Sequence, residues 1–206
     1  PVLVKPCDEG SSRGIHQNSL VYDKESLVMR VNEGLGLYNP PMMITEYIDG
    51  REFHVGVIGN GEDLCLLPIE EISLVNLPVT LHKFYSFEVK AHYKHLTDYF
   101  CPAPIDDVLK KQMLDISKNT FKALSLKDYA RLDIRLKGDI PCVLEVNSLP
   151  GLMEGHSALT RMAAIQGLKY DDLILNILLC AFRRNKISPE PLFNVKALND
   201  EIYTAS

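Results

Sequence analysis

A pair of alternating segments joined by a short turn constrains the fold of this chain more than any other feature. Residues 129–136 read YARLDIRL and residues 142–147 read CVLEVN, with KGDIP between them. Apolar and polar side chains that alternate with a period of two indicate strands with one buried face. A glycine-containing turn between two such strands predicts an antiparallel β-hairpin. We therefore expect antiparallel strands at the centre of the fold.

The rest of the pattern predicts an α+β fold with a mostly antiparallel sheet and flanking helices. Helices are predicted at residues 24–36 with Gly34 and Gly36 as the stop, at 106–124, at 157–166 with Gly167 as the stop, and at 171–184. Strands are predicted at residues 2–5, in the segments FHVGVIG and LCLLPI joined by NGED, and, as a short strand or linker, at 44–48. Residues 74–104 lack a regular period and predict a long functional loop.

The composition argues against several classes of protein. With 206 residues, 46% of them hydrophobic, the chain can form one large domain or two small ones. A net charge of -5 argues against nucleic acid as a partner. The five cysteines form no CxxC pair, which argues against zinc and favours the cytoplasm over a secreted disulfide framework. No signal peptide is visible, and the apolar segment LILNILLCAF is too short to span a membrane.

Three side chains of the predicted hairpin are candidates for metal binding. A hairpin that buries its leucines displays Asp133, Glu145 and Asn147 together on its other face, beside Arg131. Two carboxylates and an amide oxygen suit Mg²⁺ or Mn²⁺ better than zinc. The NSLPG turn that follows can direct backbone N–H groups at an anion, which strengthens this interpretation. A solvated outer face with charges of both signs is the alternative.

Five motifs, in order and in spacing, resemble the D-alanine–D-alanine ligase family. They are VKPCDEGSSRG, EYIDGREF, FEVKAHY followed by TDYFCP, ARLD, and LEVNSLPG ending in HS. The resemblance runs from residue 2 to about residue 184. It implies the ATP-grasp fold, in which two α+β lobes hold ATP between them.

The resemblance also implies a domain division. Residues 1–50 would form a partial small lobe with the phosphate loop and adenine hinge, residues 51–186 the large C-terminal lobe with the metal and substrate site, and residues 187–206 a polar tail. The chain opens in the middle of a predicted strand, which indicates part of a longer protein. The family's N-terminal domain, which supplies part of the first D-alanine site, is therefore expected to be absent from this chain.

Nucleotide-binding roles follow from the resemblance. Two lysines that reach the ATP phosphates are matched by Lys5 and Lys90, and the loop that closes over the phosphates is matched by Glu9, Ser11 and Ser12. The adenine hinge is matched by the backbone of Glu46, Tyr47 and Ile48, and the acid that binds the ribose is matched by Glu52. Backbone N–H groups of a Gly-Ser loop can surround a phosphate because no bulky side chain blocks its approach. From the residues alone, a surface lysine, an ordinary turn and a solvated Glu52 remain alternatives.

The resemblance also assigns the reaction chemistry. Asp133, Glu145 and Asn147 match the ligands of two Mg²⁺ ions, for which Mn²⁺ could substitute. Arg131 and the N–H of Gly151 match the groups that stabilise the tetrahedral intermediate, and Ser11 and Lys90 are grouped with them as catalytic residues. Ser157 matches a hydroxyl that holds the carboxylate of the second substrate.

The chain departs from the family pattern where the amine substrate would bind. Thr45 stands where the family usually has a glutamate that contacts adenine. Ser86 and Ala91 replace an aspartate and a tyrosine of the substrate loop, so His92 or Tyr93 is expected to take the place of the missing ring. The turn GLMEGHS is one residue longer than usual. These changes leave the substrate pair open.

The function implied is an ATP-dependent ligase that joins two D-alanines through an acyl phosphate for bacterial peptidoglycan precursors. Its partners would be small amino-acid substrates, without nucleic acid or membrane, and the complete protein could form a homodimer. The alternatives are an ATP-grasp carboxylate–amine ligase for another amino-acid or depsipeptide pair, and an ATP-binding module without catalysis. Five histidines are interpreted as surface or packing residues because no two share a metal-ligand spacing: His16, His54, His82, His95 and His156.

Overall fold

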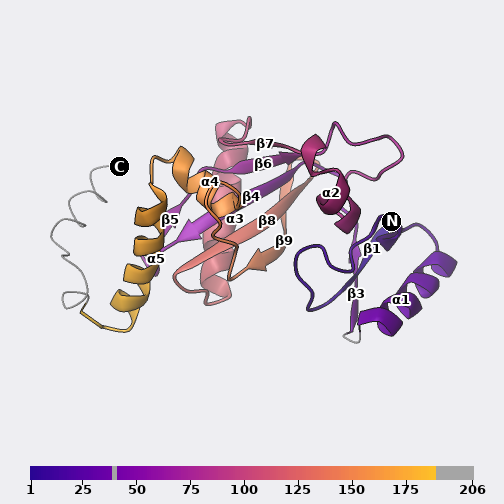
Figure 1. Cartoon of the computed structure of the whole chain (residues 1–206), viewed down its shortest axis with the longest axis horizontal. Helices are drawn as coiled ribbons and strands as arrows, with labels where there is room; N and C mark the ends of the chain where they lie inside the picture. The colour runs from indigo at the N-terminus through magenta and orange to yellow at the C-terminus, as the bar shows by residue number, and fades with distance from the viewer. Residues whose placement is uncertain (39–40, 189–206) are drawn as a thin grey trace. The chain divides into compact units, whose positions relative to one another are not determined.

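A computed structural model describes residues 1–38 and 41–188, and the chain divides into two compact units (Figure 1). The first unit comprises Pro1–Asp49 and Ser73–Asp98, and the second comprises Gly50–Ile72 and the described residues from Tyr99 onward. Ser73–Asp98, which the sequence assigns to the large lobe, therefore falls with the first unit. The predicted polar tail lies, after residue 188, outside the described residues.

The first unit is built on a three-stranded antiparallel sheet of order β2-β1-β3. Its elements are β1 (Val2–Pro6), the 3-10 helix η1 (Gln17–Ser19), β2 (Leu20–Val21), α1 (Lys24–Tyr38), β3 (Met42–Glu46), α2 (Phe87–His92) and the 3-10 helix η2 (Lys94–Leu96). The predicted first strand and first helix are confirmed, but the predicted helix stop is wrong, since Gly34 and Gly36 lie inside α1. At Gly34 the end of the flexible Met42 side chain from β3 occupies the space that a Cβ would need.

The predicted long loop at residues 74–104 contains regular structure and is wrong in that respect. Helix α2 begins after Ser86, whose side chain accepts a hydrogen bond from the N–H of Val89. The N–H of Phe87 donates to the carbonyl of Ile15 at 2.8 Å, and Val89 is fully buried. Contacts with residues far away in the sequence therefore stabilise this six-residue helix, which explains why no sequence period marks it.

The second unit is built on a sheet of order β7-β6-β4-β8-β9, in which β5 also pairs with β4. Its strands are β4 (Glu52–Ile58), β5 (Cys65–Leu66), β6 (Glu70–Ser73), β7 (Asp98–Phe100), β8 (Tyr129–Lys137) and β9 (Ile140–Asn147), and its helices are α3 (Asp107–Ala123), α4 (Ala158–Ile165) and α5 (Tyr170–Arg184). The predicted hairpin and the three predicted helices are confirmed. The predicted strand LCLLPI is confined to β5, because Pro68 cannot donate to a ladder, and β6 follows it unpredicted.

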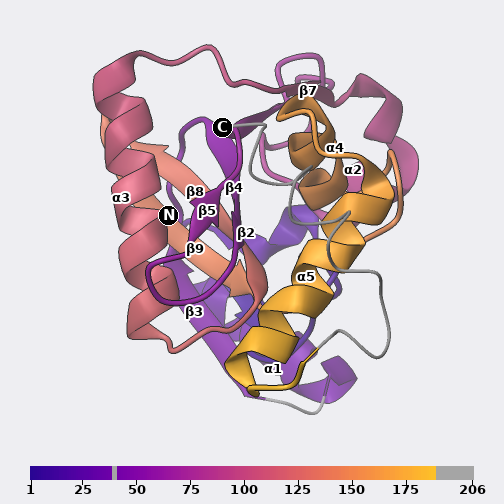
Figure 2. The same ribbon diagram turned by 90° about the vertical axis from the view of Figure 1, so that its left-hand side faces the viewer.

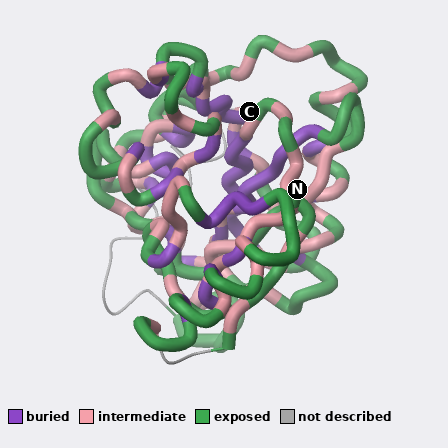
Figure 3. Tube along the Cα trace, turned by 90° about the vertical axis from the view of Figure 1, so that its right-hand side faces the viewer, coloured by how far each residue is buried: buried purple, intermediate pink, exposed green. Residues whose placement is uncertain are grey.

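Helices cover both faces of this sheet. Figure 2 shows α3 on one side and α4 and α5 on the other. Under α3 the core consists of side chains such as Phe53, Val55, Leu132 and Met113, all fully buried. The second core lies under α4 and α5 and includes Leu159, Met162 and Leu173. The buried residues gather along the central strands (Figure 3), as expected for a sheet between two helical layers.

A β-bulge interrupts the hairpin of β8 and β9. Ile134 lies opposite Val143, whereas the adjacent Asp133 lies opposite Glu145, so Leu144 is an extra residue in β9. The prediction of strict alternation in this strand is therefore wrong at Leu144, which is 41% exposed. After the bulge the side chains of Glu145 and Asp133 share one face of the sheet.

Asp128, just before β8, anchors α5 through its carboxylate. Arg184 Nη2 donates to Asp128 Oδ2 at 2.8 Å, and Asn60 Nδ2 donates to Oδ1 at 2.8 Å. Hydrogen bonding by Arg184 lowers the pKa of Asp128, against the smaller opposing effect of burial. A carboxylate with a depressed pKa in the folded state stabilises the fold above its unfolded pKa of about 4, and the contribution is lost as the pH falls through the folded value.

We therefore expect Asp128→Asn to lower the midpoint of urea unfolding at neutral pH. Near pH ~3 the difference from the unchanged chain should shrink, because the aspartate is then losing its charge. Asp115→Asn is a suitable control, since Asp115 forms an ion pair within α3, with Lys111 at 2.6 Å, and both side chains are exposed. An equal deficit of Asp128→Asn at both pH values would contradict the role assigned to its charge.

Candidate active site

The glycine-serine loop after β1 is held in an unusual backbone conformation. Ser11 and Ser12 have φ values of 58° and 62°, in the left-handed region that side chains rarely adopt. The hydroxyl of Ser12 donates to the carbonyl of Tyr85 at 2.9 Å, and Lys90 Nζ donates to the carbonyl of Ser11 at 3.3 Å. The structure thus brings the predicted phosphate loop and the second predicted phosphate lysine together. Lys5 lies on β1, half-buried, directly before this loop.

Side chains around the loop fix it further. His16 Nδ1 lies 2.8 Å from Glu88 Oε1. Burial raises the pKa of Glu88, but hydrogen bonds with Ser86, with its own backbone N–H and with His16, together with the electrostatic effect of His16, outweigh burial, so the pKa is lowered. Arg30, which is 4% exposed, donates to the carbonyl of Gly14 at 3.0 Å. The sequence interpretation missed Arg30 because nothing in the helical pattern of α1 marks an arginine that turns inward.

The predicted adenine hinge, Glu46–Ile48, begins at the last residue of β3. The N–H of Tyr47 donates to the carbonyl of Pro1 at 3.2 Å, and its ring meets the ring of Phe84 edge-on at 5.9 Å between centroids. His92, predicted to take the place of the missing tyrosine, is the exposed last residue of α2. These contacts all lie within the first unit.

Asp133 is the centre of the polar cluster in the second unit. It is 8% exposed, and Arg131 donates to both of its oxygens, from Nε to Oδ1 at 2.6 Å and from Nη2 to Oδ2 at 2.8 Å. Asn147 Nδ2 donates to Asp133 Oδ2 at 3.1 Å and to Glu145 Oε1 at 3.4 Å. The three predicted metal ligands and the predicted oxyanion arginine therefore form one contiguous group.

The charges in this group stabilise each other. Burial raises the pKa of Asp133, but the electrostatic effect of His54, the hydrogen bonds and charge of Arg131 and a hydrogen bond with Glu145 together outweigh burial, so the pKa is lowered. Burial likewise lowers the pKa of Arg131, but the hydrogen bonds to Asp133, together with the negative charges of Asp133, Glu145 and Glu70, outweigh burial, so that pKa is raised. An ionised carboxylate beside a permanent cation is the result at neutral pH.

The donor set fits a hard divalent cation. Two carboxylates and an amide oxygen can each offer an oxygen to Mg²⁺, and a cation at Asp133 would compete with Arg131 and Asn147 for Oδ2. Within the described ranges, no group of three or more His, Cys, Asp or Glu side chains is arranged to hold a metal ion. The predicted metal site contains two carboxylates, those of Asp133 and Glu145, and its third ligand would be the amide oxygen of Asn147.

The turn after β9 carries two further predicted residues. Ser157 Oγ accepts from the N–H of Met153 at 3.0 Å, and its hydroxyl proton can still be donated to a carboxylate. A Cβ at Gly151 would lie 3.0 Å from Ser157 Oγ, so only glycine fits there without displacing the serine. Glu52, at the start of β4, accepts from Arg135 Nε at 3.0 Å and is therefore an ion-pair partner as well as the predicted ribose ligand.

The predicted site residues are divided between the units. The first unit contains Lys5, Glu9, Ser11, Ser12, Glu46, Tyr47, Ile48, Lys90 and His92, and the second contains Glu52, Arg131, Asp133, Glu145, Asn147, Gly151 and Ser157. Three buried or half-buried polar residues that lead by successive contacts to Asp133 were not predicted as part of the site: His54, Glu70 and Arg161. No local sequence signal marks these residues, because their contacts depend on which strands lie side by side and in what register. Among the described helices, none is long and apolar enough to cross a membrane.

The antiparallel sheets and their flanking helices define an ATP-grasp fold. A D-alanine–D-alanine ligase from Bacillus anthracis, whose structure was solved in complex with ATP, matches with a TM-score of 0.70 and 27% identity over 90% of this chain and 54% of its own. The chain belongs to the D-alanine–D-alanine ligase family, because the family model described as D-ala D-ala ligase C-terminus matches residues 1–179.

Curated relatives support the same family. The chain is 38% identical, over 89% of its length and 53% of the relative, to the uncharacterized protein y4sG of Sinorhizobium fredii. It is 32% identical to a D-alanine–D-alanine ligase of Desulfotalea psychrophila, over 90% of this chain and 55% of the relative. The chain thus spans about half the length of the curated relatives it matches. A D-Ala:D-Ser ligase from Enterococcus faecalis, VanG, shares the fold with a TM-score of 0.68 at 23% identity.

Proposed function

We propose that the complete protein to which this chain belongs is an ATP-dependent ligase that joins two D-alanines for cytoplasmic synthesis of peptidoglycan precursors. The observation that carries the proposal is the contiguous group of Arg131, Asp133, Glu145 and Asn147. A protein that only binds ATP has no need of the arginine that, by the family resemblance, would bind an oxyanion. Membership of the ligase family adds independent support.

In the proposed reaction, the carboxylate of the first amino acid takes the γ-phosphoryl group of ATP to give an acyl phosphate. The amine of the second amino acid then attacks the acyl carbon, and phosphate leaves. Bound Mg²⁺ would neutralise the charge of the transferring phosphoryl group, and Asp133, Glu145 and Asn147 would hold it. The protein contributes mainly positioning and electrostatic stabilisation to such a reaction.

Named residues would perform the remaining tasks. Lys5 and Lys90 would hold phosphate oxygens, and the hydroxyl of Ser157 would hold the carboxylate of the second amino acid. Arg131 uses two of its five N–H groups on Asp133, so others can reach the oxyanion together with the N–H of Gly151. The nucleotide would contact the backbone of Glu46–Ile48 through adenine and Glu52 through the ribose.

The longer turn before Ser157 favours a second candidate, a ligase for another amino-acid or depsipeptide pair. Gly155 adopts a φ of +66° in this turn, and Thr160 donates to the carbonyl of Met153 at 3.0 Å, so the additional residue is built into an ordered structure. Ala91, which stands in place of the usual tyrosine of the substrate loop, also favours a different amine substrate. Both changes concern the amine substrate and leave the phosphoryl-transfer residues intact.

The test is to incubate the complete protein with ATP, Mg²⁺ and single or paired amino acids, and to measure phosphate and dipeptide. Phosphate and D-alanyl-D-alanine from D-alanine alone would support the proposal. Phosphate with another pair, but not with D-alanine, would favour the second candidate. Magnesium-dependent ATP binding without phosphate release from any pair would identify a binding module.

A further inference from the structure

A row of four polar side chains crosses the sheet of the second unit. His54 on β4 lies opposite Glu70 on β6 and, on its other side, opposite Asp133 on β8. Asp133 in turn lies opposite Glu145 on β9. Residues directly opposite in antiparallel strands point to the same side, so the four side chains share one face.

Three consecutive members of the row, Glu70, His54 and Asp133, are in contact and buried. His54 Nδ1 lies 3.1 Å from Glu70 Oε1, and His54 Nε2 lies 3.7 Å from Asp133 Oδ1. The exposed fraction is 8% for His54, 0% for Glu70 and 8% for Asp133. With one ring nitrogen at Glu70, the other nitrogen is directed at the carboxylate proposed to bind the metal.

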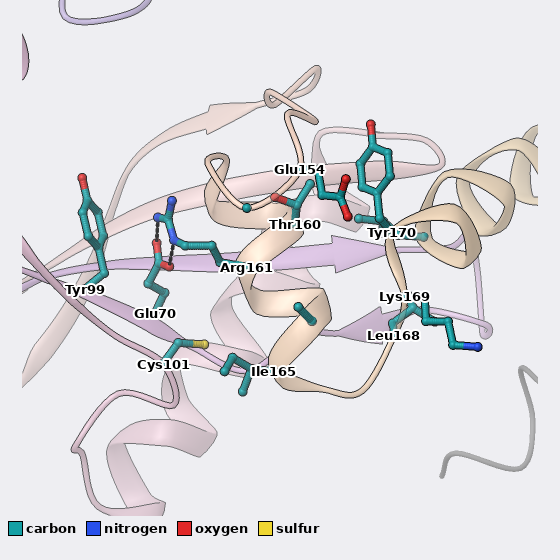
Figure 4. Close-up of a pocket in the computed structure, with 13 residues that line it drawn as sticks. Glu70, Tyr99, Cys101, Glu154, Thr160, Arg161, Ile165, Leu168, Lys169 and Tyr170 are labelled. Carbon is teal, nitrogen blue, oxygen red and sulfur yellow. Dashed lines mark hydrogen bonds and ion pairs between the residues drawn. The ribbon is translucent and has the colours of Figure 1, made fainter.

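Arg161 of α4 holds the far end of the row. It donates to both oxygens of Glu70, from Nε to Oε2 at 2.8 Å and from Nη2 to Oε1 at 2.6 Å, and its guanidinium lies 4.4 Å from the ring centre of Tyr99. Figure 4 shows this ion pair beside Tyr99 in the wall of a cavity of about 600 Å³. Two parallel hydrogen bonds from Arg161 fix both the position and the orientation of the Glu70 carboxylate. Arg161 belongs to α4, the helix that begins directly after the predicted substrate residue Ser157.

A fully buried glutamate is costly unless charged partners surround it, so its presence here calls for a role. We propose that Glu70 and His54 are positioning residues for the metal carboxylate: Glu70, held by Arg161, orients the ring of His54, and that ring fixes Asp133. The inference rests on the proposed function, because it presumes that Asp133 binds the divalent cation. Groups that orient metal ligands typically change metal affinity by 10- to 100-fold when they are removed.

The chain contains its own control. Glu71 is the next residue of β6, points to the other face and is 7% exposed. Arg51 binds both of its oxygens at 2.7 Å, so Glu71 is also a buried glutamate with a bidentate arginine partner. Glu70 differs from Glu71 in its contact with His54. Comparing Glu70→Gln with Glu71→Gln therefore separates positioning of Asp133 from the general cost of disturbing a buried ion pair.

The experiment measures Mn²⁺ binding to the complete protein in the presence of a non-hydrolysable ATP analogue, through the paramagnetic resonance signal of free Mn²⁺. We expect Glu70→Gln to raise the dissociation constant of Mn²⁺ about tenfold, and Glu71→Gln to leave it within about twofold of the unchanged protein. The thermal unfolding curve of each variant is measured first, so that Mn²⁺ binding is compared at a temperature at which all variants are folded. Equal effects of the two substitutions, or no effect of Glu70→Gln, would overturn the proposal.

A second variant covers the case in which Glu70→Gln does not fold. His54→Leu removes the ring but keeps the ion pair of Glu70 and Arg161, and it should also weaken Mn²⁺ binding about tenfold. Unchanged Mn²⁺ affinity in His54→Leu would overturn the proposal. An unchanged protein that binds Mn²⁺ but releases no phosphate would refute the ligase function alone, whereas one that binds no Mn²⁺ would refute the positioning role too.

Discussion

Replacing Glu145 with glutamine is expected to lower the ATP turnover of the complete protein about 1,000-fold or more. The substitution removes one of two carboxylates in the predicted metal set while keeping the size of the side chain. Metal ions contribute several kcal/mol of charge stabilisation in reactions of this kind, and much of it is lost with a ligand. Phosphate release with saturating substrates at several Mg²⁺ concentrations is the measurement.

The fold should survive this change because Glu145 is exposed on β9. Asp139→Asn is the matched control, since Asp139 is an exposed carboxylate in the turn of the same hairpin. It should have the turnover and the unfolding midpoint of the unchanged protein. Normal phosphate release by Glu145→Gln would refute its assignment as a metal ligand, and a collapse of the unfolding midpoint would indicate a structural role instead.

Replacing Lys90 with alanine is expected to reduce turnover about 100-fold with little effect on stability. Lys90 is exposed on α2, its Nζ reaches the carbonyl of Ser11, and alanine favours helix. Loss of one cation from the phosphoryl group removes transition-state stabilisation without opening a cavity. Steady-state phosphate release and thermal unfolding of the same preparation test both parts of this expectation.

Lys94→Ala serves as the control for Lys90→Ala. Lys94 is an exposed lysine of η2, which follows α2, and no role in binding phosphate is assigned to it. Its replacement should leave turnover unchanged. If Lys90→Ala unfolds at a clearly lower temperature, or if both variants lose activity equally, the assignment of Lys90 to the phosphates fails.

The hairpin and the long helices could be predicted because their patterns are local. Apolar and polar side chains alternate along residues 129–136, and the apolar residues of α3 recur at helical spacing. These local patterns indicate which face of each element is buried. Helix α2 escaped prediction because six residues are too few to show a period and its supports, such as Ile15, lie far away in the sequence. Gly34 and Gly36 were wrongly predicted to end the first helix, because glycine propensity is a weak signal: Gly34 is buried inside α1, and Gly36 is exposed and continues it.

Part of the candidate site could likewise be predicted from local patterns, and part could not. The motif residues around Asp133 could be placed on one face from alternation and from the family resemblance. The row from Glu70 to Asp133 could not, because it depends on which strand lies beside which and in what register. Two adjacent glutamates in a four-residue strand give no local sign of burial, and their arginine partners come from separate parts of the chain.

The bulge at Leu144 has a consequence for how this hairpin can change in length during evolution. A regular ladder counted from the turn would place Leu144 opposite Asp133 and would send Glu145 to the apolar face. Deleting Leu144 would straighten β9 and keep the two carboxylates opposite each other, whereas deleting one residue of β8 between Asp133 and the turn would rotate Asp133 into the core. We therefore expect loss of the extra residue at Leu144 to be tolerated among family members, and single-residue deletions in β8 between Asp133 and the turn to be rejected.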